Sequence, residues 1–124
     1  MNLVDSSAWL EYFANGENAE FFSKVIENTA ELIVPTICLY EVYKRICLQS
    51  GEAKALSAIA SMMQGQIVAL DSKLALSAAK MSLEEKLHMA DSILLTTAHA
   101  NNAIFWTQDA DFKDVPGVQY KVKN

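Results

Sequence analysis

Short apolar runs of strand length alternate with longer runs of helical periodicity along the 124 residues, and this alternation limits the possible folds strongly. The predicted strands are Asn2–Val4, Glu31–Val34, Gln66–Leu70, Ala103–Trp106 and Val118–Val122. The predicted helices are Ser7–Ala14, Asn18–Asn28, Thr36–Gln49, Glu52–Met63, Ser72–Lys86 and Asp91–Asn101. Strands separated by helices favour parallel pairing with helices on both faces of the sheet. The sequence therefore predicts an α/β protein, a three-layer α/β/α sandwich with a mostly parallel central sheet.

The composition is typical of one folded unit. Hydrophobic residues make up 52% of the chain, and only four glycines and two prolines are present, which leaves no obvious linker. We therefore expect a single domain over residues 1–124. No apolar run approaches the roughly 20 residues needed to span a bilayer, and the first residues lack the pattern of a signal peptide. Cys38 and Cys47 are predicted to be buried free thiols, because their positions along one helix are too far apart to bridge. We expect a cytoplasmic protein without membrane contact.

Four acidic residues are predicted to meet at one edge of the sheet. Asp5 directly follows the first strand, and Asp109 follows Ala103–Trp106 after a short turn. Asp91 opens a predicted helix, and Glu41 lies in the second turn of another. The carboxyl ends of parallel strands and the N-termini of the connecting helices share an edge, which is where ligands bind in such sheets. The four carboxylates should therefore converge there.

The apolar surroundings of these acids indicate metal binding. Glu41 lies within the segment Ile37–Tyr43, and Asp91 precedes Ser92–Leu95. Partly buried carboxylates are costly unless they are paired or bound to a metal, and like charges raise one another's pKa. Mg²⁺ or Mn²⁺ accepts carboxylate oxygens together with water and phosphate oxygens. The pattern predicts a site for metal-assisted phosphodiester hydrolysis.

Each acid also has a purely structural interpretation. Asp5 could cap the helix that follows it, and Glu41 could pair with Arg45 one turn further along. Asp91 could stabilise a helix dipole, and Asp109 could form a turn. Four such residues at one edge favour a functional site over four unrelated structural roles.

The net charge of −5 weakly opposes a protein that holds nucleic acid through phosphate contacts. A divalent ion over clustered acids would reverse the local sign of charge. Lys44 and Arg45, just beyond Glu41, are the candidates for phosphate contact, and a solvated helix face is the alternative interpretation for both.

Four segments in this order resemble the PIN-domain family, and in particular the VapC-type toxins of bacterial toxin–antitoxin pairs. They are Leu3–Ser7, Leu39–Val42, Met89–Thr96 and Phe105–Phe112. The resemblance implies a Mg²⁺- or Mn²⁺-dependent endoribonuclease that hydrolyses RNA and acts as the toxin of such a pair. It assigns the metal to Asp5, Glu41, Asp91 and Asp109.

The resemblance also implies secondary roles and partners. Ser7 and Thr107 correspond to small hydroxyl residues that support the acids by hydrogen bonding, and Asp111 corresponds to an auxiliary acid. The implied partners are an RNA substrate, a second copy of the chain in a homodimer, and a cognate antitoxin whose C-terminal segment covers the active site. Independently of the resemblance, the predicted second helix is strongly apolar on one side, with Phe21 and Phe22, and this helix is the expected dimer or antitoxin surface.

Two other classes of protein fit less well. An aspartyl-nucleophile phosphatase needs a second acid two residues after its nucleophile, where Ser7 stands. A dinucleotide-binding domain needs a glycine-rich turn after the first strand, and none is present. The remaining alternative is a catalytically quiet PIN-like module that acts as a binding or regulatory partner.

Overall fold

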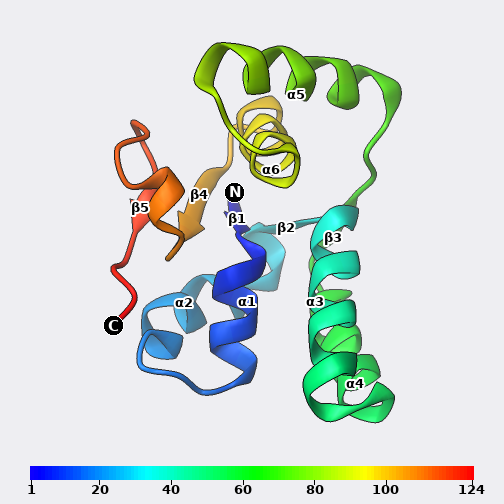
Figure 1. The fold of residues 1–124 in the computed structure, drawn as a ribbon. Coiled ribbons are helices and arrows are strands. Elements are labelled where there is room, and N and C mark those ends of the chain that lie inside the picture. The colour runs from blue at the N-terminus through cyan, green and yellow to red at the C-terminus, as the bar shows by residue number, and fades with distance from the viewer.

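The five strands of the computed structural model, which describes residues 1–124, form one sheet in which every neighbouring pair is parallel. Their order is β3-β2-β1-β4-β5, so β1 lies in the middle (Figure 1). Their bounds are Asn2–Val4 for β1, Leu32–Pro35 for β2, Gln66–Val68 for β3, Ile104–Thr107 for β4 and Gln119–Tyr120 for β5.

Six α-helices connect and cover these strands. They are α1 (Ser6–Phe13), α2 (Ala19–Ile26), α3 (Thr36–Ser50), α4 (Glu52–Met62), α5 (Ser72–Glu85) and α6 (Met89–Ala100), with short 3₁₀ turns η1 (Thr29–Glu31) and η2 (Ala110–Phe112). Figure 1 shows α5 and α6 on one side of the central strands and α1 and α2 on the other, with α3 and α4 packed together beside α1. The predicted α/β class with a parallel sheet is confirmed.

The centre of the sheet is also the centre of the core. Leu3 and Val4 of β1 are fully buried, and every residue of β2 is buried. Such continuous burial is typical of a parallel strand covered on both faces, and it explains why these strands read as unbroken apolar runs. Phe105 of β4 packs edge-on against Phe112 of η2, with 4.7 Å between ring centroids, and this contact fixes the turn after β4.

The apolar side of α2 faces the core rather than solvent. Phe22 is fully buried, and Val25 and Ile26 are nearly so. Phe21 is half-buried against Trp106, with ring centroids 5.4 Å apart. Burial of these side chains against the sheet accounts for the apolar pattern, so the pattern no longer supports a dimer or antitoxin surface on this helix, and that surface stays a prediction.

Two smaller predictions concern the cysteines and membranes. Cys38 and Cys47 are both free, but only Cys38 is buried, while Cys47 is half-buried near the end of α3. None of the helices has the length and apolar character that a membrane span requires.

Candidate active site

The strand order creates a crevice beside β1. From β1 the chain proceeds through β2 to β3 on one side of the sheet, and then returns to place β4 and β5 on the other side. Open α/β sheets bind ligands at such a reversal, outside the carboxyl ends of the strands. Asp5 follows β1 directly, and its N–H donates a 2.9 Å hydrogen bond to the carbonyl of Trp106 in β4. The ends of the two strands are thereby held together.

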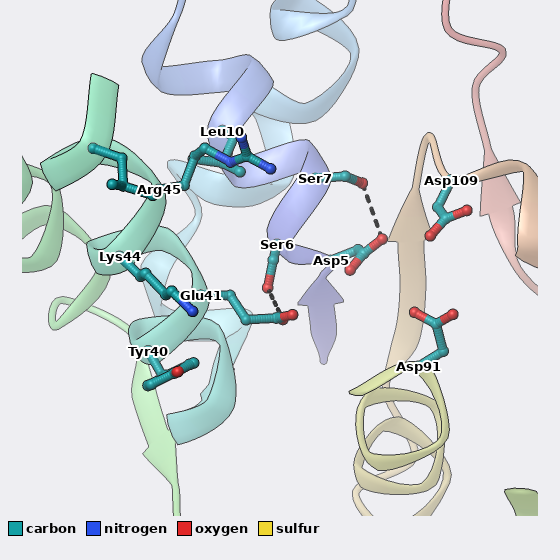
Figure 2. A pocket seen from close by; sticks show the side chains of 11 residues that line it. Asp5, Ser6, Ser7, Leu10, Tyr40, Glu41, Lys44, Arg45, Asp91 and Asp109 are labelled. Carbon is teal, nitrogen blue, oxygen red and sulfur yellow. Dashed lines mark hydrogen bonds between the residues drawn. The ribbon is translucent and has the colours of Figure 1, made fainter. Parts of the chain in front are cut away.

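A pocket of about 440 Å³ opens at this point, and all four predicted acids line it. Asp5 comes from the end of β1, Glu41 from α3, Asp91 from the first turn of α6, and Asp109 from the connection after β4. Figure 2 shows the four side chains directed into a shared space. The structure therefore brings together residues that are more than a hundred positions apart in the sequence.

Asp5 is the most buried of these acids, with 4% of its surface exposed. Its Oδ2 accepts hydrogen bonds from the hydroxyls of Ser7 (3.0 Å) and Thr107 (2.7 Å), the two residues predicted to support the acids. Oδ1 accepts no hydrogen bond from the protein, and the side chain does not cap α1 although Asp5 occupies the N-cap position. The helix-capping interpretation therefore does not hold.

Burial raises the pKa of Asp5 to about 6. The hydrogen bonds from Thr107 and Ser7 stabilise the ionised form and oppose this shift, while the negative charges of Asp109 and Glu41 add to it. The ionised form of Asp5 is thus less favourable in the pocket than in water.

Asp91 lies in the first turn of α6, where the helix dipole would favour a negative charge. Its pKa is nevertheless raised to about 7, first by burial and then by the charges of Asp109, Asp5 and Asp111, with His88 acting in the opposite direction. Repulsion among the acids and loss of hydration outweigh the dipole. Stabilisation of the helix dipole therefore does not account for the raised pKa of Asp91.

Glu41 is held by a contact that the sequence did not reveal. The Ser6 hydroxyl donates a 2.7 Å hydrogen bond to Oε1 of Glu41, linking α1 to α3 (Figure 2). None of the ion pairs in the structure joins Glu41 to Arg45, so the predicted alternative of a surface ion pair does not apply. Ser6 instead fixes Glu41 in the pocket.

Asp109 both stabilises the turn after β4 and lines the pocket. Its Oδ1 accepts the N–H of Asp111 at 2.9 Å and so caps η2, as the turn interpretation predicts. Its own N–H donates to Oγ1 of Thr107 at 2.9 Å. Thr107 therefore bridges Asp5 and the backbone of Asp109, and Oδ2 of Asp109 accepts no protein hydrogen bond.

Lys44 and Arg45 line the same pocket from α3. Both side chains are exposed, and the Nζ of Lys44 lies 5.6 Å from the ring centroid of Tyr40, which is also exposed. Positive charge is thus placed next to the acids in a chain whose net charge is −5. The wall formed by α3 can attract a phosphate group that the carboxylates alone would repel.

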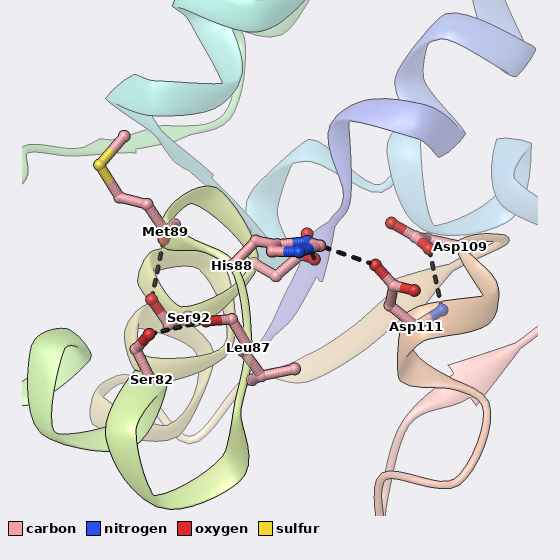
Figure 3. Close-up of polar contacts among 8 residues, drawn as sticks. Ser82, Leu87, His88, Met89, Ser92, Asp109 and Asp111 are labelled. Atoms are coloured by element: carbon pink, nitrogen blue, oxygen red, sulfur yellow. Dashed lines mark hydrogen bonds and ion pairs between the residues drawn. The ribbon is translucent and has the colours of Figure 1, made fainter.

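His88 and Asp111 lie beside the pocket rather than in its lining. The Nδ1 atom of His88 is 3.8 Å from Oδ2 of Asp111 and 4.0 Å from Oδ2 of Asp91. One potential ligand atom from each of these three residues, an imidazole nitrogen or a carboxylate oxygen, lies within 4.8 Å of the other two. Figure 3 shows His88 beside Asp111. The spacing of three residues between His88 and Asp91 was the signal available in the sequence for this contact.

The donor set of the pocket suits a hard divalent cation. All four acids offer carboxylate oxygen, the ligand that Mg²⁺ and Mn²⁺ prefer. Asp5 and Asp109 each present one oxygen that accepts no hydrogen bond from the protein. The residues present therefore fit such an ion in kind and in the availability of their oxygens.

The fold and the pocket define a class: parallel α/β proteins with a cluster of carboxylates at the reversal of strand order. The chain belongs to the PIN domain family, whose model matches residues 3–118. No curated protein matches the chain.

Solved structures share this fold at low sequence identity. A toxin–antitoxin complex from Klebsiella pneumoniae aligns with a TM-score of 0.78 at 22% identity, over 95% of each chain. VapC20 of Mycobacterium tuberculosis, a toxin that cleaves the sarcin–ricin loop, aligns with a TM-score of 0.79 at 14% identity, over 96% of this chain and 98% of that one. VapBC2 of Rickettsia felis, bound to a promoter DNA fragment, aligns with a TM-score of 0.74 at 13% identity, over 99% and 98%. The resemblance seen in the sequence motifs is confirmed at the level of family and fold.

Proposed function

We propose that this protein is an endoribonuclease that hydrolyses RNA phosphodiester bonds with Mg²⁺ or Mn²⁺ held by Asp5, Glu41, Asp91 and Asp109. The observation that carries the proposal is that carboxylates from four separate elements line one pocket at the reversal of strand order. Gathering them costs free energy, which is expressed in the raised pKa values of Asp5 and Asp91. A divalent cation would offset that cost.

The residues of the pocket have different proposed roles. A bound divalent ion supplies a water of lowered pKa and stabilises charge on the leaving oxygen. Ser7 and Thr107 orient Asp5 through its Oδ2 and leave Oδ1 free for a ligand. Ser6 orients Glu41 in the same way. Asp111 acts as an auxiliary acid at the rim.

We assign phosphate binding to two side chains of α3. Lys44 and Arg45 are the exposed cations that line the pocket, and they would contact the backbone of a single-stranded or looped RNA on either side of the scissile bond. Attraction by these two residues would compensate locally for the negative charge of the whole chain.

We further propose that the protein is the toxin of a cytoplasmic toxin–antitoxin pair. The fold shared with structures of toxin–antitoxin complexes supports this role. The implied partners are a cognate antitoxin, whose C-terminal segment would cover the pocket, and a second copy of the chain in a homodimer.

Cleavage of a panel of structured and unstructured RNAs by the purified protein tests the enzymatic proposal. We expect cleavage with Mn²⁺ or Mg²⁺, none with EDTA, and loss of at least a hundredfold in rate, about 2.7 kcal/mol of barrier, for Asp91→Asn. The matched control is Glu20→Gln, which removes an exposed carboxylate on α2 outside the pocket. Unchanged cleavage by Asp91→Asn, or an inert wild-type protein, would contradict the proposal, and the latter result would favour a quiet binding module.

A further inference from the structure

We propose that His88, Asp91 and Asp111 form a second divalent-cation position, beside the four-carboxylate pocket and sharing Asp91 with it. The proposed function assigns the ion to the pocket acids alone, and this second position deepens it by adding a nitrogen ligand. The inference rests on that function in so far as Asp91 belongs to both positions.

The geometry of the three ligand atoms is close to that of a coordination shell. In an octahedral shell with metal–ligand distances of about 2.1 Å, neighbouring ligands are about 3 Å apart and opposite ligands about 4.2 Å apart. Nδ1 of His88 lies 3.8 Å from the Asp111 carboxylate and 4.0 Å from the Asp91 carboxylate. Both distances lie between the values for neighbouring and opposite ligands, and the third pair of atoms lies within 4.8 Å.

The same distances are too long for hydrogen bonds. The imidazole of His88 makes no hydrogen bond to the protein, and its side chain is 88% exposed, so no contact within the fold explains its position. Figure 3 shows the ring directed at Asp111, with the carboxylate of Asp111 facing it. The three side chains therefore surround a space to which water has access, and waters could complete the shell.

The backbone on both sides of this space is held in place. The Ser82 hydroxyl donates a 2.6 Å hydrogen bond to the carbonyl of Leu87, and His88 itself begins α6 as its N-cap residue. On the other side, Oδ1 of Asp109 accepts the N–H of Asp111. The ligands are thus presented by two anchored segments, the start of α6 and the 3₁₀ turn after β4 (Figure 3).

The ligand type distinguishes this position from the pocket. An imidazole nitrogen suits Zn²⁺, Fe²⁺ or Ni²⁺ better than Mg²⁺, whereas a shell of carboxylate and water oxygens suits Mg²⁺ and Mn²⁺ alike. We therefore assign the second position to a first-row transition-metal ion. Because Asp91 carries two oxygens, it can serve both positions, one oxygen to each.

Electron spin echo spectroscopy of Mn²⁺ bound to protein without a histidine tag tests this assignment directly. Nitrogen bound to Mn²⁺ modulates the echo, and carboxylate oxygen does not. We expect nitrogen modulation in the wild type, its loss in His88→Ala, and a fall in Mn²⁺ stoichiometry from two ions to one by calorimetry. The matched control is His99→Ala, which removes the only other histidine, an exposed residue at the opposite end of α6.

Further variants separate this inference from the proposed function. Asp111→Asn should remove the nitrogen modulation and the second ion, while Asp5→Asn should weaken the pocket ion and retain the modulation. Mn²⁺ binding without nitrogen modulation in the wild type would overturn the second position and leave the pocket site standing. Absence of any Mn²⁺ binding would overturn both. His88 is exposed, so its replacement should not disturb folding, and an unchanged circular dichroism spectrum checks this.

Discussion

The hydroxyl of Thr107 donates a 2.7 Å hydrogen bond to Oδ2 of Asp5, across 102 positions of sequence. It also accepts the N–H of Asp109, so one fully buried threonine ties the end of β1 to the turn that carries another acid. The arrangement of the pocket therefore depends on a residue that is closed to solvent and does not line the pocket.

Thr107→Val is expected to destabilise the protein by about 1–3 kcal/mol at neutral pH. The substitution preserves shape but leaves the N–H of Asp109 without its partner and removes a hydrogen bond to a buried carboxylate. Urea denaturation measures the change. Thr97→Val is the control, because Thr97 is equally buried but its hydroxyl donates only to the carbonyl of Ile93 in its own helix. If Thr97→Val lowers the free energy of unfolding as much as Thr107→Val does, the hydrogen bonds at the site contribute no more to stability than a hydrogen bond within a helix.

Stability without metal should fall as the pH rises. Asp91 has a pKa raised from its ordinary value of 3.8 to about 7, and Asp5 to about 6, so the folded state binds more protons than the unfolded state between these values. Raising the pH from about 4 to about 7 therefore lowers the free energy of unfolding. Asp91→Asn should flatten this slope in EDTA. A slope equal to that of the wild type would mean that Asp91 titrates normally.

Divalent metal should restore the stability that the protein loses as the pH approaches neutrality. A free Mn²⁺ concentration of 100 times Kd would stabilise the wild type by about 2.7 kcal/mol, observable as a rise in the melting temperature. Asp5→Asn should lose most of that rise, because it removes a charge at the base of the pocket. Glu52→Gln, at the exposed start of α4, should keep it. If Mn²⁺ raises the melting temperature of Asp5→Asn as much as that of the wild type, the ion binds elsewhere.

Replacement of both Lys44 and Arg45 by alanine should weaken RNA binding and its dependence on salt. Each phosphate contact to a single strand contributes about 0.7 to the slope of log K against log salt concentration, so the loss of two contacts should reduce the slope by about 1.4. Fluorescence anisotropy in the Asp91→Asn background measures binding without cleavage. Lys24→Ala, on α2 and outside the pocket, is the control. If the double variant and Lys24→Ala show the same salt dependence, Lys44 and Arg45 form only a solvated helix face.

Much of the fold could be predicted because its signals are local. The predicted helix Glu52–Met63 differs from α4 by one residue, since helical periodicity is carried by the segment itself. The predicted strand Gln66–Leu70 was too long because the end of β3 is set by its pairing with β2. Val68 pairs with Pro35, and beyond that residue β2 gives way to α3 and offers no further partner. Apolar character alone could not locate that end.

The site could be predicted as an edge of the sheet but not as a set of contacts. The rule that ligands bind at the carboxyl ends of parallel strands placed Asp5 and Asp109 together. The hydrogen bond from Ser6 to Glu41 depends on how closely α1 packs against α3, which no spacing in the sequence reveals. The approach of His88 to Asp111 depends in the same way on the path of two connections. Whether the residues brought together hold metal and cleave RNA stays a prediction.

The central place of β1 has a consequence for how the four-carboxylate pocket can be lost. Asp5 extends the strand that pairs with β2 on one side and with β4 on the other, so no fraying at the margins of the sheet can displace it. Separating Asp5 from Asp109 requires β1 and β4 to part, and that rupture divides the whole core. Amide hydrogens of Val4 and Asp5 should accordingly exchange only through global unfolding, and partial denaturation should yield a mixture of intact and inactive molecules rather than a uniformly weakened population.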